Sequence, residues 1–147
     1  MFLNILVAID GSASARRALE RAVDVAKAMN STLTLVTVSP PLSNFVTLAG
    51  VNPETMQAEL DSWAEQVLRE AAASLPDDVS ARRIQRSGHA GPQILEELGK
   101  GRYDLVVLGS RGRGRTQEGL LGSVNLYLHF HSHVPLLSVP DEPEPSG

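Results

Sequence analysis

A glycine-rich segment in the last third of the chain has the composition of an anion-binding loop. Residues 109–112, with the sequence Gly-Ser-Arg-Gly, follow an apolar run at 105–108, and a Gly-Ser pair comes after nine further residues, at 122–123. Glycine lets a backbone come close to an anion, and the N–H groups at the start of a helix point towards negative charge. The spacing therefore favours a phosphate-binding site with room for a polyphosphate.

Three arginines in the same segment, Arg111, Arg113 and Arg115, could supply positive charge to the phosphates. A guanidinium can bind two phosphate oxygens at once, but exposed arginines in a loop could equally serve only solubility. Two widespread phosphate motifs do not fit, because the glycine order in 109–114 differs from the dinucleotide fingerprint and no lysine follows the second glycine. We therefore expect a nucleotide site that works without a P-loop lysine.

A second group of residues that could bind a ligand follows the apolar run 5–9, where Asp10 is followed by Gly11 and Ser12. The Asp10 carboxylate could face a ligand and help to place Mg²⁺ or a water molecule, or it could only cap the helix that follows. No pair of side chains is arranged in the sequence as a nucleophile with its base. We therefore predict no catalytic residue.

Three histidines, His129, His131 and His133, form a further candidate cluster. On a helix His129 and His133 would share one face at a spacing typical of metal ligands, and on an extended segment all three would. Histidines near the C-terminal end of a helix also interact favourably with its negative end, and no obvious carboxylate accompanies these three. We expect no metal site here.

The pattern of apolar residues predicts the elements that position these groups. Apolar or weakly alternating runs predict five strands, at 5–9, 33–38, 79–86, 104–108 and 134–139. Apolar residues at helical spacing predict intervening helices, around 15–26, 53–71, 91–98 and 120–128. Strands that alternate with helices through short connections are typical of a parallel sheet covered on both faces.

We expect one doubly wound α/β domain at residues 1–140, with a five-stranded, mainly parallel sheet of strand order 3-2-1-4-5 and helices on both faces. Residues 141–147 form an acidic, proline-rich tail. Ligands of such sheets bind beyond the carboxyl ends of the strands, where the strand order reverses. Asp10 and Gly109 follow the first and fourth strands, so both should face one cleft.

Composition narrows the classes of function. The chain has 147 residues, a formal net charge of −4 and no cysteine, which argues against nucleic-acid binding by bulk electrostatics, against disulfides and against thiolate metal sites. No apolar run approaches the roughly 20 residues that cross a bilayer, and the N-terminus lacks the features of a signal peptide. We expect a cytoplasmic protein with no membrane partner.

The pairing of these motifs resembles the universal stress protein family, and within it the nucleotide-binding branch. The resemblance rests on Ala-Ile-Asp-Gly-Ser at 8–12 and on the pattern G-2x-G-9x-G-S at 109–123. It extends over nearly the whole chain, since Gly88 and the segments 104–109 and 134–137 also have equivalents in the family pattern.

The resemblance implies that an adenine nucleotide, ATP or else ADP or AMP, lies between the loops after the first and fourth strands, with Mg²⁺ held through the phosphates. Asp10 corresponds to the family's acidic residue near the nucleotide, and the backbone of Val38 to the position that faces adenine. Asn125 departs from the family, which usually has Ser or Thr there, but its amide can still donate to a phosphate oxygen. The implied nucleotide-binding residues are Ala8, Ile9, Asp10, Val38, Leu108, Gly109, Arg111, Gly112, Gly122, Ser123, Val124 and Asn125.

The resemblance also implies a homodimer, paired through the last strand from Pro135 to Val139, and a role as an ATP-binding sensor or regulator of the stress response. Two alternatives stay open at this point. One is a homodimeric interaction module of the same family that binds no nucleotide, and the other is an enzyme that hydrolyses ATP slowly.

Overall fold

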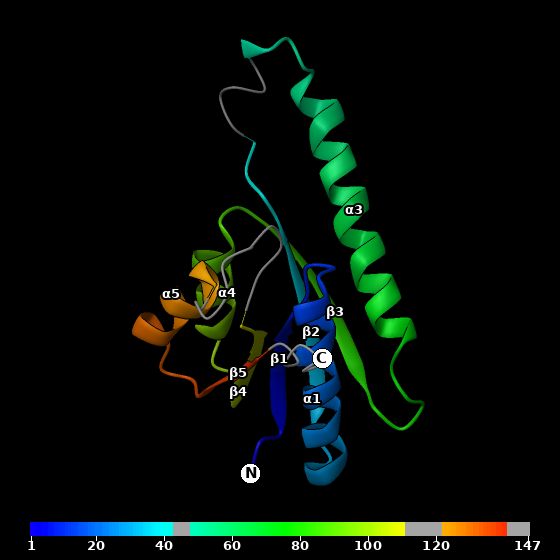
Figure 1. The fold of residues 1–147 in the computed structure, drawn as a ribbon, viewed down its shortest axis with the longest axis vertical. Helices are drawn as coiled ribbons and strands as arrows, with labels where there is room; N and C mark the ends of the chain where they lie inside the picture. The colour runs from blue at the N-terminus through cyan, green and yellow to red at the C-terminus, as the bar shows by residue number, and fades with distance from the viewer. Residues whose placement is uncertain (43–47, 111–121, 141–147) are drawn as a thin grey trace, which may run out of the picture.

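The computed structural model describes residues 1–42, 48–110 and 122–140. Its centre is a sheet of five strands in the order β3-β2-β1-β4-β5, in which every neighbouring pair is parallel (Figure 1). This confirms the predicted fold class and strand order. The strands are β1 Asn4–Ala8, β2 Thr32–Ser39, β3 Ala81–Ser87, β4 Leu105–Gly109 and β5 Leu136–Val139.

The described helices cover the two faces of the sheet. Helices α1 and α3 pack on one face, and α4 and α5 pack on the other (Figure 1). Helix α3 is long, and its N-terminal part projects past the end of the sheet (Figure 1). The helices are α1 Ala13–Met29, α3 Pro53–Ala73, α4 Ala90–Leu98 and α5 Ser123–His131.

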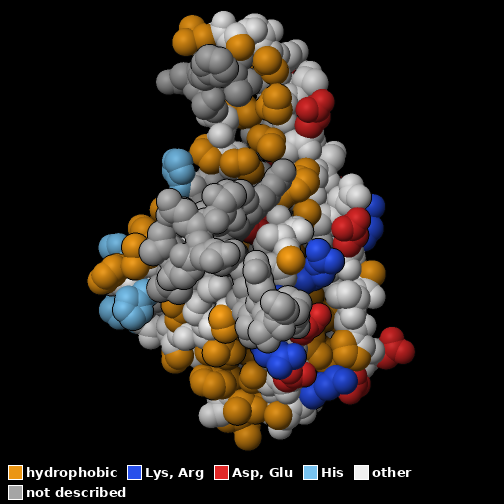
Figure 2. Space-filling view, in the orientation of Figure 1, with side chains coloured by type: hydrophobic (Ala, Val, Ile, Leu, Met, Phe, Trp, Pro, Cys, Tyr) orange, Lys and Arg blue, Asp and Glu red, His pale blue; other side chains and the backbone are white. Residues whose placement is uncertain are grey.

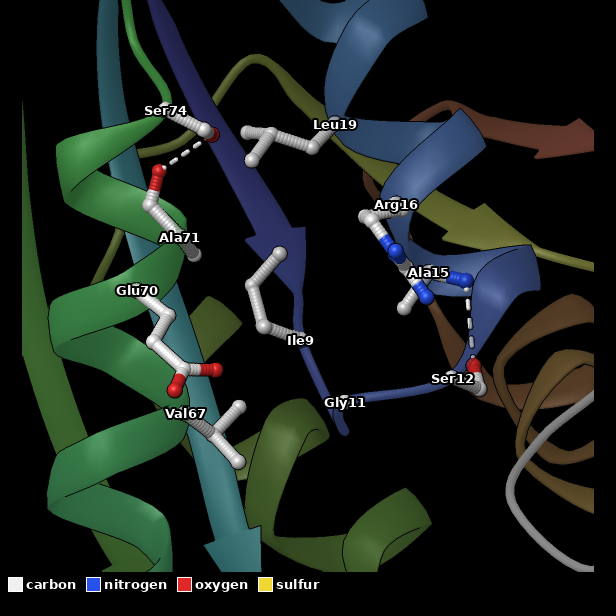
Figure 3. Close-up of a pocket in the computed structure, with 10 residues that line it drawn as sticks. All are labelled: Ile9, Gly11, Ser12, Ala15, Arg16, Leu19, Val67, Glu70, Ala71 and Ser74. Atoms are coloured by element: carbon white, nitrogen blue, oxygen red, sulfur yellow. Dashed lines mark hydrogen bonds between the residues drawn. The ribbon is translucent and has the colours of Figure 1, made fainter.

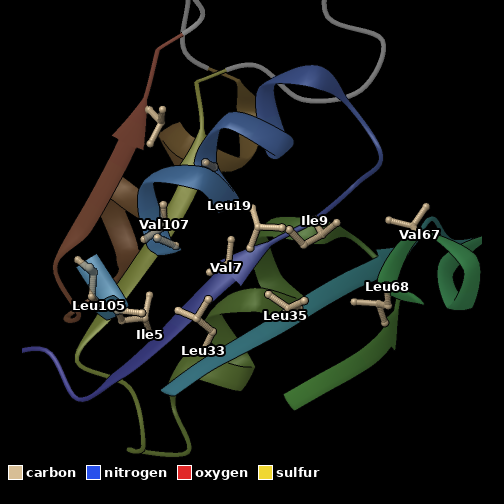
Figure 4. Close-up of a cluster of buried hydrophobic side chains, with 14 residues drawn as sticks. Ile5, Val7, Ile9, Leu19, Leu33, Leu35, Val67, Leu68, Leu105 and Val107 are labelled. Carbon is tan, nitrogen blue, oxygen red and sulfur yellow. The ribbon is translucent and has the colours of Figure 1, made fainter. Parts of the chain in front are cut away.

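Two apolar clusters, one on each face of the sheet, hold the layers together. Because successive side chains of a strand point to opposite faces, β1 sends Ile5 and Val7 towards α1 and α3, and Leu6 towards α4 and α5. All three are fully buried, and each contributes roughly 1.5–3 kcal/mol to stability through its removal from water. Figure 4 shows the first cluster, in which Leu19 of α1 and Leu68 of α3 pack over the strands.

Local capping signals begin two of the helices where the structure has them. Ser12 caps α1, because its hydroxyl accepts a hydrogen bond from the N–H of Ala15 at 3.1 Å. Asn52 caps α3 through the N–H of Glu54 at 2.9 Å, and Pro53 occupies the first turn as the sequence predicts. These caps fix where each helix leaves the preceding loop.

The observed elements differ from the predicted ones mainly at their ends. Strand β3 begins two residues after the predicted start at 79, because the N–H of Val79 bonds to the carbonyl of Pro76 at 3.1 Å in a turn. The first residues of the predicted last helix, 120–121, and the predicted tail, 141–147, lie outside the described residues. Among the helices in residues 1–42, 48–110 and 122–140, none combines the length and the apolar character needed to cross a membrane.

The strand order reverses between β1 and β4. The chain moves outward from β1 to β3 and then returns to place β4 on the other side of β1. In sheets of this kind the connections after the two central strands leave in opposite directions, and a crevice opens between them at the carboxyl ends of the strands. Predicted site residues stand at both places, because Ile9 and Asp10 follow β1 and Gly109 is the last residue of β4.

Candidate functional site

A cleft of about 630 Å³ lies at the carboxyl ends of β1, β2 and β4. The structure brings to it every predicted site residue that it describes, from segments that are far apart in the sequence. Two further predicted residues, Arg111 and Gly112, lie outside the described residues. The predicted residues that line the cleft are Ala8, Ile9, Asp10, Val38, Leu108, Gly109, Gly122, Ser123, Val124 and Asn125.

The loop after β1 is held in shape by Asp10 and Ser12. Asp10 Oδ1 accepts hydrogen bonds from the backbone N–H of Ser12 at 2.9 Å and from the Ser12 hydroxyl at 2.5 Å. Gly11 between them has a φ of +82°, a backbone conformation that favours glycine. Ser12 rather than Asp10 caps α1, so the Asp10 carboxylate orients the capping residue and also lines the cleft.

Gly109 lines the cleft where β4 runs close against the first turn of α1. A Cβ atom at this position would lie 2.2 Å from Ser14 Oγ and 2.7 Å from both the carbonyl carbon and the carbonyl oxygen of Ser14. Real Cβ atoms do not approach other atoms so closely. The absence of a side chain at 109 is therefore explained by the packing of β4 on α1, independently of any phosphate.

Helix α5 begins at the cleft, with Gly122 as its N-cap and Ser123 as its first residue. No side chain of the described residues caps this helix start. The N–H of Gly122 donates to the carbonyl of Ser110 at 2.6 Å and so connects the helix start to the end of β4. The next backbone N–H groups of α5 are of the kind that binds anions at helix starts.

Asn125 is buried in the first turn of α5 and joins this helix to β4. Its Nδ2 donates a hydrogen bond to the carbonyl oxygen of Gly109. Its Oδ1 is buried and has no hydrogen-bond partner in the part of the chain that the structure describes. The sequence suggested that this amide donates to a phosphate, whereas the structure gives its Nδ2 a partner inside the protein.

The sequence missed several residues that line the cleft. Leu60 and Trp63 lie nearly one turn apart on α3, and their helical spacing identified them only as part of an apolar stripe. That spacing shows which residues share a face of a helix, but not which of them lie beyond the sheet that the helix covers. The additional lining residues are Ala15, Val36, Pro40, Leu60, Trp63, Ala90 and Ile94.

The described walls of the cleft are mostly apolar. Asp10 is the one ionisable side chain among the described lining residues, and Ser123 and Asn125 add polar groups at the start of α5. Val38 and Trp63 belong to the apolar part, which β2 and α3 contribute. The cleft therefore combines apolar surface with a helix start, an arrangement suited to a ligand that has both an apolar and an anionic part.

A buried charged cluster holds α4, which forms one wall of the cleft, against β3. Glu97 of α4 is fully buried and accepts hydrogen bonds from Arg86 Nη1 at 2.9 Å and from the Tyr103 hydroxyl at 2.7 Å. Burial raises the pKa of Glu97, but hydrogen bonds from Tyr103, Lys100 and Arg86 outweigh this effect, so its pKa lies below the usual 4.5. Burial and the bond to Glu97 raise the pKa of Tyr103 to about 12.

The three histidines lie at the C-terminal end of α5. His129 and His131 stand in the last turn of the helix, and His133 follows it. The ring of His131 packs against the ring of Tyr127, with centroids 4.4 Å apart. Over residues 1–42, 48–110 and 122–140, the structure places no three metal-ligating side chains where they could hold an ion together.

A smaller pocket of about 290 Å³ lies between α1 and α3, next to the loop after β1 (Figure 3). Ile9 and Val67 provide apolar walls, while Arg16 of α1 and Glu70 of α3 line it with opposite charges. Of the predicted site residues that the structure describes, only Ile9 reaches this pocket. The sequence motifs therefore point to the larger cleft.

Comparison with known proteins identifies the family. The sequence model of the universal stress protein family matches residues 1–140. The chain belongs to the universal stress protein family. Universal stress protein Rv1996 of Mycobacterium tuberculosis is 32% identical to this family member over 159 residues, covering 98% of this chain and 50% of the relative. The chain thus spans about half the length of the first curated relatives that it matches.

Two solved structures are similar over nearly the whole of this family member. The protein MJ0577 has a TM-score of 0.84 at 22% identity, covering 97% of this chain and 99% of its own, a likeness that supports the fold. A universal stress protein crystallised in complex with cAMP has a TM-score of 0.64 at 29% identity, covering 94% of this chain and 97% of its own. That second protein binds an adenine nucleotide.

Proposed function

We propose that this universal stress protein binds an adenine nucleotide in the cleft at the ends of β1, β2 and β4, and that it works as a nucleotide-dependent sensor or regulator of the stress response. The observation that carries the proposal is the meeting of four separate segments, 8–10, 38, 108–109 and 122–125, around one cavity. These segments are far apart in the sequence, and the topology of the sheet brings them to one edge, where a single ligand can contact all four.

The size and the chemistry of the cleft support a nucleotide. Its volume of about 630 Å³ lies within the range of roughly 300–1,000 Å³ that small-ligand sites occupy. The start of α5 offers backbone N–H groups to phosphates, while Val38 and Leu108 offer apolar surface to the base and the ribose. The solved relative that binds cAMP supports an adenine nucleotide as the ligand.

ATP is the proposed ligand, and ADP and AMP are its competitors for the same cleft. We propose that Mg²⁺ enters with the phosphates of the nucleotide, since phosphate oxygens are ligands that this ion prefers. The carboxylate of Asp10, which lines the cleft, has the charge to assist by holding a water molecule of the ion.

Titration calorimetry and thermal unfolding with Mg-ATP, Mg-ADP and AMP test the proposal. A ligand that binds only the folded protein stabilises it by about 2.7 kcal/mol when its concentration is 100 times its Kd. We expect a saturable heat and a rise in Tm that grows with nucleotide concentration. If all three nucleotides produce neither effect, the proposal is rejected and the interaction module without nucleotide becomes the better account.

Ser123→Asp tests the phosphate end of the cleft specifically. Ser123 is exposed at the first position of α5, where a carboxylate stabilises a helix, so the variant should fold. A negative charge at this place repels phosphates, and we expect at least about tenfold weaker binding of ATP. Ser123→Asn, which has the same size without the charge, should bind nearly as the wild type does. Equal affinities of the two variants would place the phosphates elsewhere.

We also propose that the protein pairs with a second copy of itself through β5. This strand lies at an edge of the sheet, and its residue Leu137 is 37% exposed. The adjacent helix α5 exposes Leu126 and Phe130, and Figure 2 shows hydrophobic and histidine side chains gathered on the left of the view, where Figure 1 has α5. An edge strand that has one strand neighbour among the described residues favours pairing with another chain. Light scattering should give twice the chain mass for the wild type and one chain mass for Leu137→Lys, whereas a monomeric wild type rejects the dimer.

A further inference from the structure

We infer that Trp63 of α3 is a specificity-determining residue of the cleft, which packs against the aromatic base of the bound nucleotide and makes the base a main source of affinity. The inference rests on the proposed function, because it names the part of the ligand that this wall recognises. None of the motifs that predicted the site reaches α3, so Trp63 is an addition to that set of residues.

Helix α3 brings a flat aromatic side chain to the apolar end of the cleft. Leu60 and Trp63, nearly one turn apart on α3, line the cleft together with Val38 and Pro40 of the β2 end. Leu60 and Trp63 are both half-buried. The Trp63 side chain therefore contributes part of its surface to the wall of the cleft.

This wall is fixed in place before any ligand binds. The carbonyl of Leu60 lies 3.4 Å from the hydroxyl of Ser39 at the end of β2, and Gln85 Nε2 of β3 donates to the carbonyl of Asp61 at 2.9 Å. Trp63 itself packs against the apolar cluster beneath α1 and α3. Because the helix is anchored to two strands at this level, a base that enters the cleft meets a preformed surface and loses little affinity to ordering it.

The chemistry of this end selects a base over a phosphate. Among the described residues around the cleft, only Asp10 carries a charge, and that charge is negative. A polyphosphate without a base would gain nothing from leucine, valine, proline and tryptophan side chains. A flat purine buries apolar surface there and stacks favourably on an indole ring. Replacing an aromatic side chain that stacks on a base commonly weakens binding by roughly 5- to 100-fold.

The test compares ATP with tripolyphosphate, which carries the same phosphates and no base. Trp63→Leu removes the aromatic ring but keeps an apolar side chain, and Trp63→Phe keeps a smaller ring. We expect about tenfold weaker ATP binding in Trp63→Leu and near wild-type binding in Trp63→Phe. Tripolyphosphate should bind equally to both variants and to the wild type, or to none of them. Gln66→Ala, an exposed change on the same helix, serves as the matched control.

A second readout comes from the wild type itself, because Trp63 is the single tryptophan of the chain. Its fluorescence should change in a saturable way with ATP and not with tripolyphosphate. If ATP binds the wild type and Trp63→Leu equally, the inference is overturned while the proposed function stands. If Trp63→Leu weakens ATP and tripolyphosphate binding by the same factor and also lowers the Tm, Trp63 has a structural role and the inference is again overturned. A wild type that binds neither ligand overturns both.

Discussion

Among the glycines whose surroundings the structure describes, Gly109 is the position at which one added methyl group should cost the most stability. In Gly109→Ala the new Cβ would stand 2.2 Å from Ser14 Oγ and 2.7 Å from the Ser14 carbonyl carbon and oxygen. A side-chain hydroxyl can rotate away, but the backbone of α1 can give way only if the helix moves relative to β4. Overpacking of this kind costs typically 1–3 kcal/mol, and we expect about 3 kcal/mol because backbone atoms are involved.

Two other glycines provide matched controls for the same chemical change. At Gly99 the nearest atom to an added Cβ is the carbonyl oxygen of Glu96 at 3.3 Å, and the backbone has an ordinary φ of −65°. We expect Gly99→Ala to change the unfolding free energy by less than about 0.5 kcal/mol. At Gly91 the Cβ would meet the ring of Tyr127 at 2.8 Å, but a ring can turn, and alanine favours the helix by up to about 1 kcal/mol.

Urea unfolding followed by circular dichroism measures the three variants on one scale. The expected order of destabilisation is Gly109→Ala, then Gly91→Ala, then Gly99→Ala. Adding Ser14→Gly to Gly109→Ala removes the contact with the hydroxyl but not those with the carbonyl group, so it should restore only part of the loss. If Gly109→Ala is as stable as the wild type, β4 does not pack against α1 as closely as the structure indicates. The packing explanation for this glycine is then refuted.

The remaining predictions concern the cluster around Glu97 and the cap of α1. The pKa of Tyr103 is raised from 10.0 to about 12, so its contribution to stability is complete below pH 10 and is lost as the pH rises towards 12, by roughly 2–3 kcal/mol. Urea titrations between these pH values should show this fall, and Tyr103→Phe should remove it; an unchanged profile in the variant refutes the assignment. The lowered pKa of Glu97 acts at the other end of the scale: its contribution is present above its usual pKa of 4.5 and is lost as the pH falls below it, so acid unfolding should be less steep in Glu97→Gln. Arg86→Leu should lower the unfolding free energy by about 3 kcal/mol at pH 7, because it removes one partner of a buried carboxylate. The double variant with Glu97→Gln, which has no buried charge at 97, should regain part of that stability. Ser12→Ala should cost about 1 kcal/mol through loss of the α1 cap, measured by thermal unfolding, with a smaller loss for Ser12→Thr, which keeps the hydroxyl that donates to Asp10.

The fold was predictable because its signals are local. Apolar runs such as 5–9 and 105–108 contain the residues that become β1 and β4, and Asn52-Pro53 marks the start of α3. Parallel strands that are buried on both faces require a continuous apolar sequence, so such strands can be recognised directly in the sequence. The ends were less certain, as the turn at Val79 shows, since the last hydrogen bonds of a strand depend on the neighbouring segment.

The candidate site was predictable only in part. The glycines and Asp10 stand at strand ends, and strand ends in a doubly wound sheet meet at one edge, so their assembly in a single cleft follows from topology. The partner of the Asn125 amide could not be read in the same way, because the carbonyl of Gly109 lies sixteen residues earlier in the chain. Trp63 was recognised as part of an apolar stripe, but an apolar stripe looks the same whether its residues lie in the core or line a ligand site.

The sequence by itself determined the order and type of the elements, the family and the positions of the motifs, because each of these depends on spacing within a short segment. The tertiary structure alone decided what the motif residues touch. It placed Ser14 against Gly109, so that packing explains this glycine, and it placed Trp63 of α3 beside the loops after the strands. Contacts of this kind depend on the distances and angles between packed layers, which are set by side chains far apart in the chain and leave no periodic mark in the sequence.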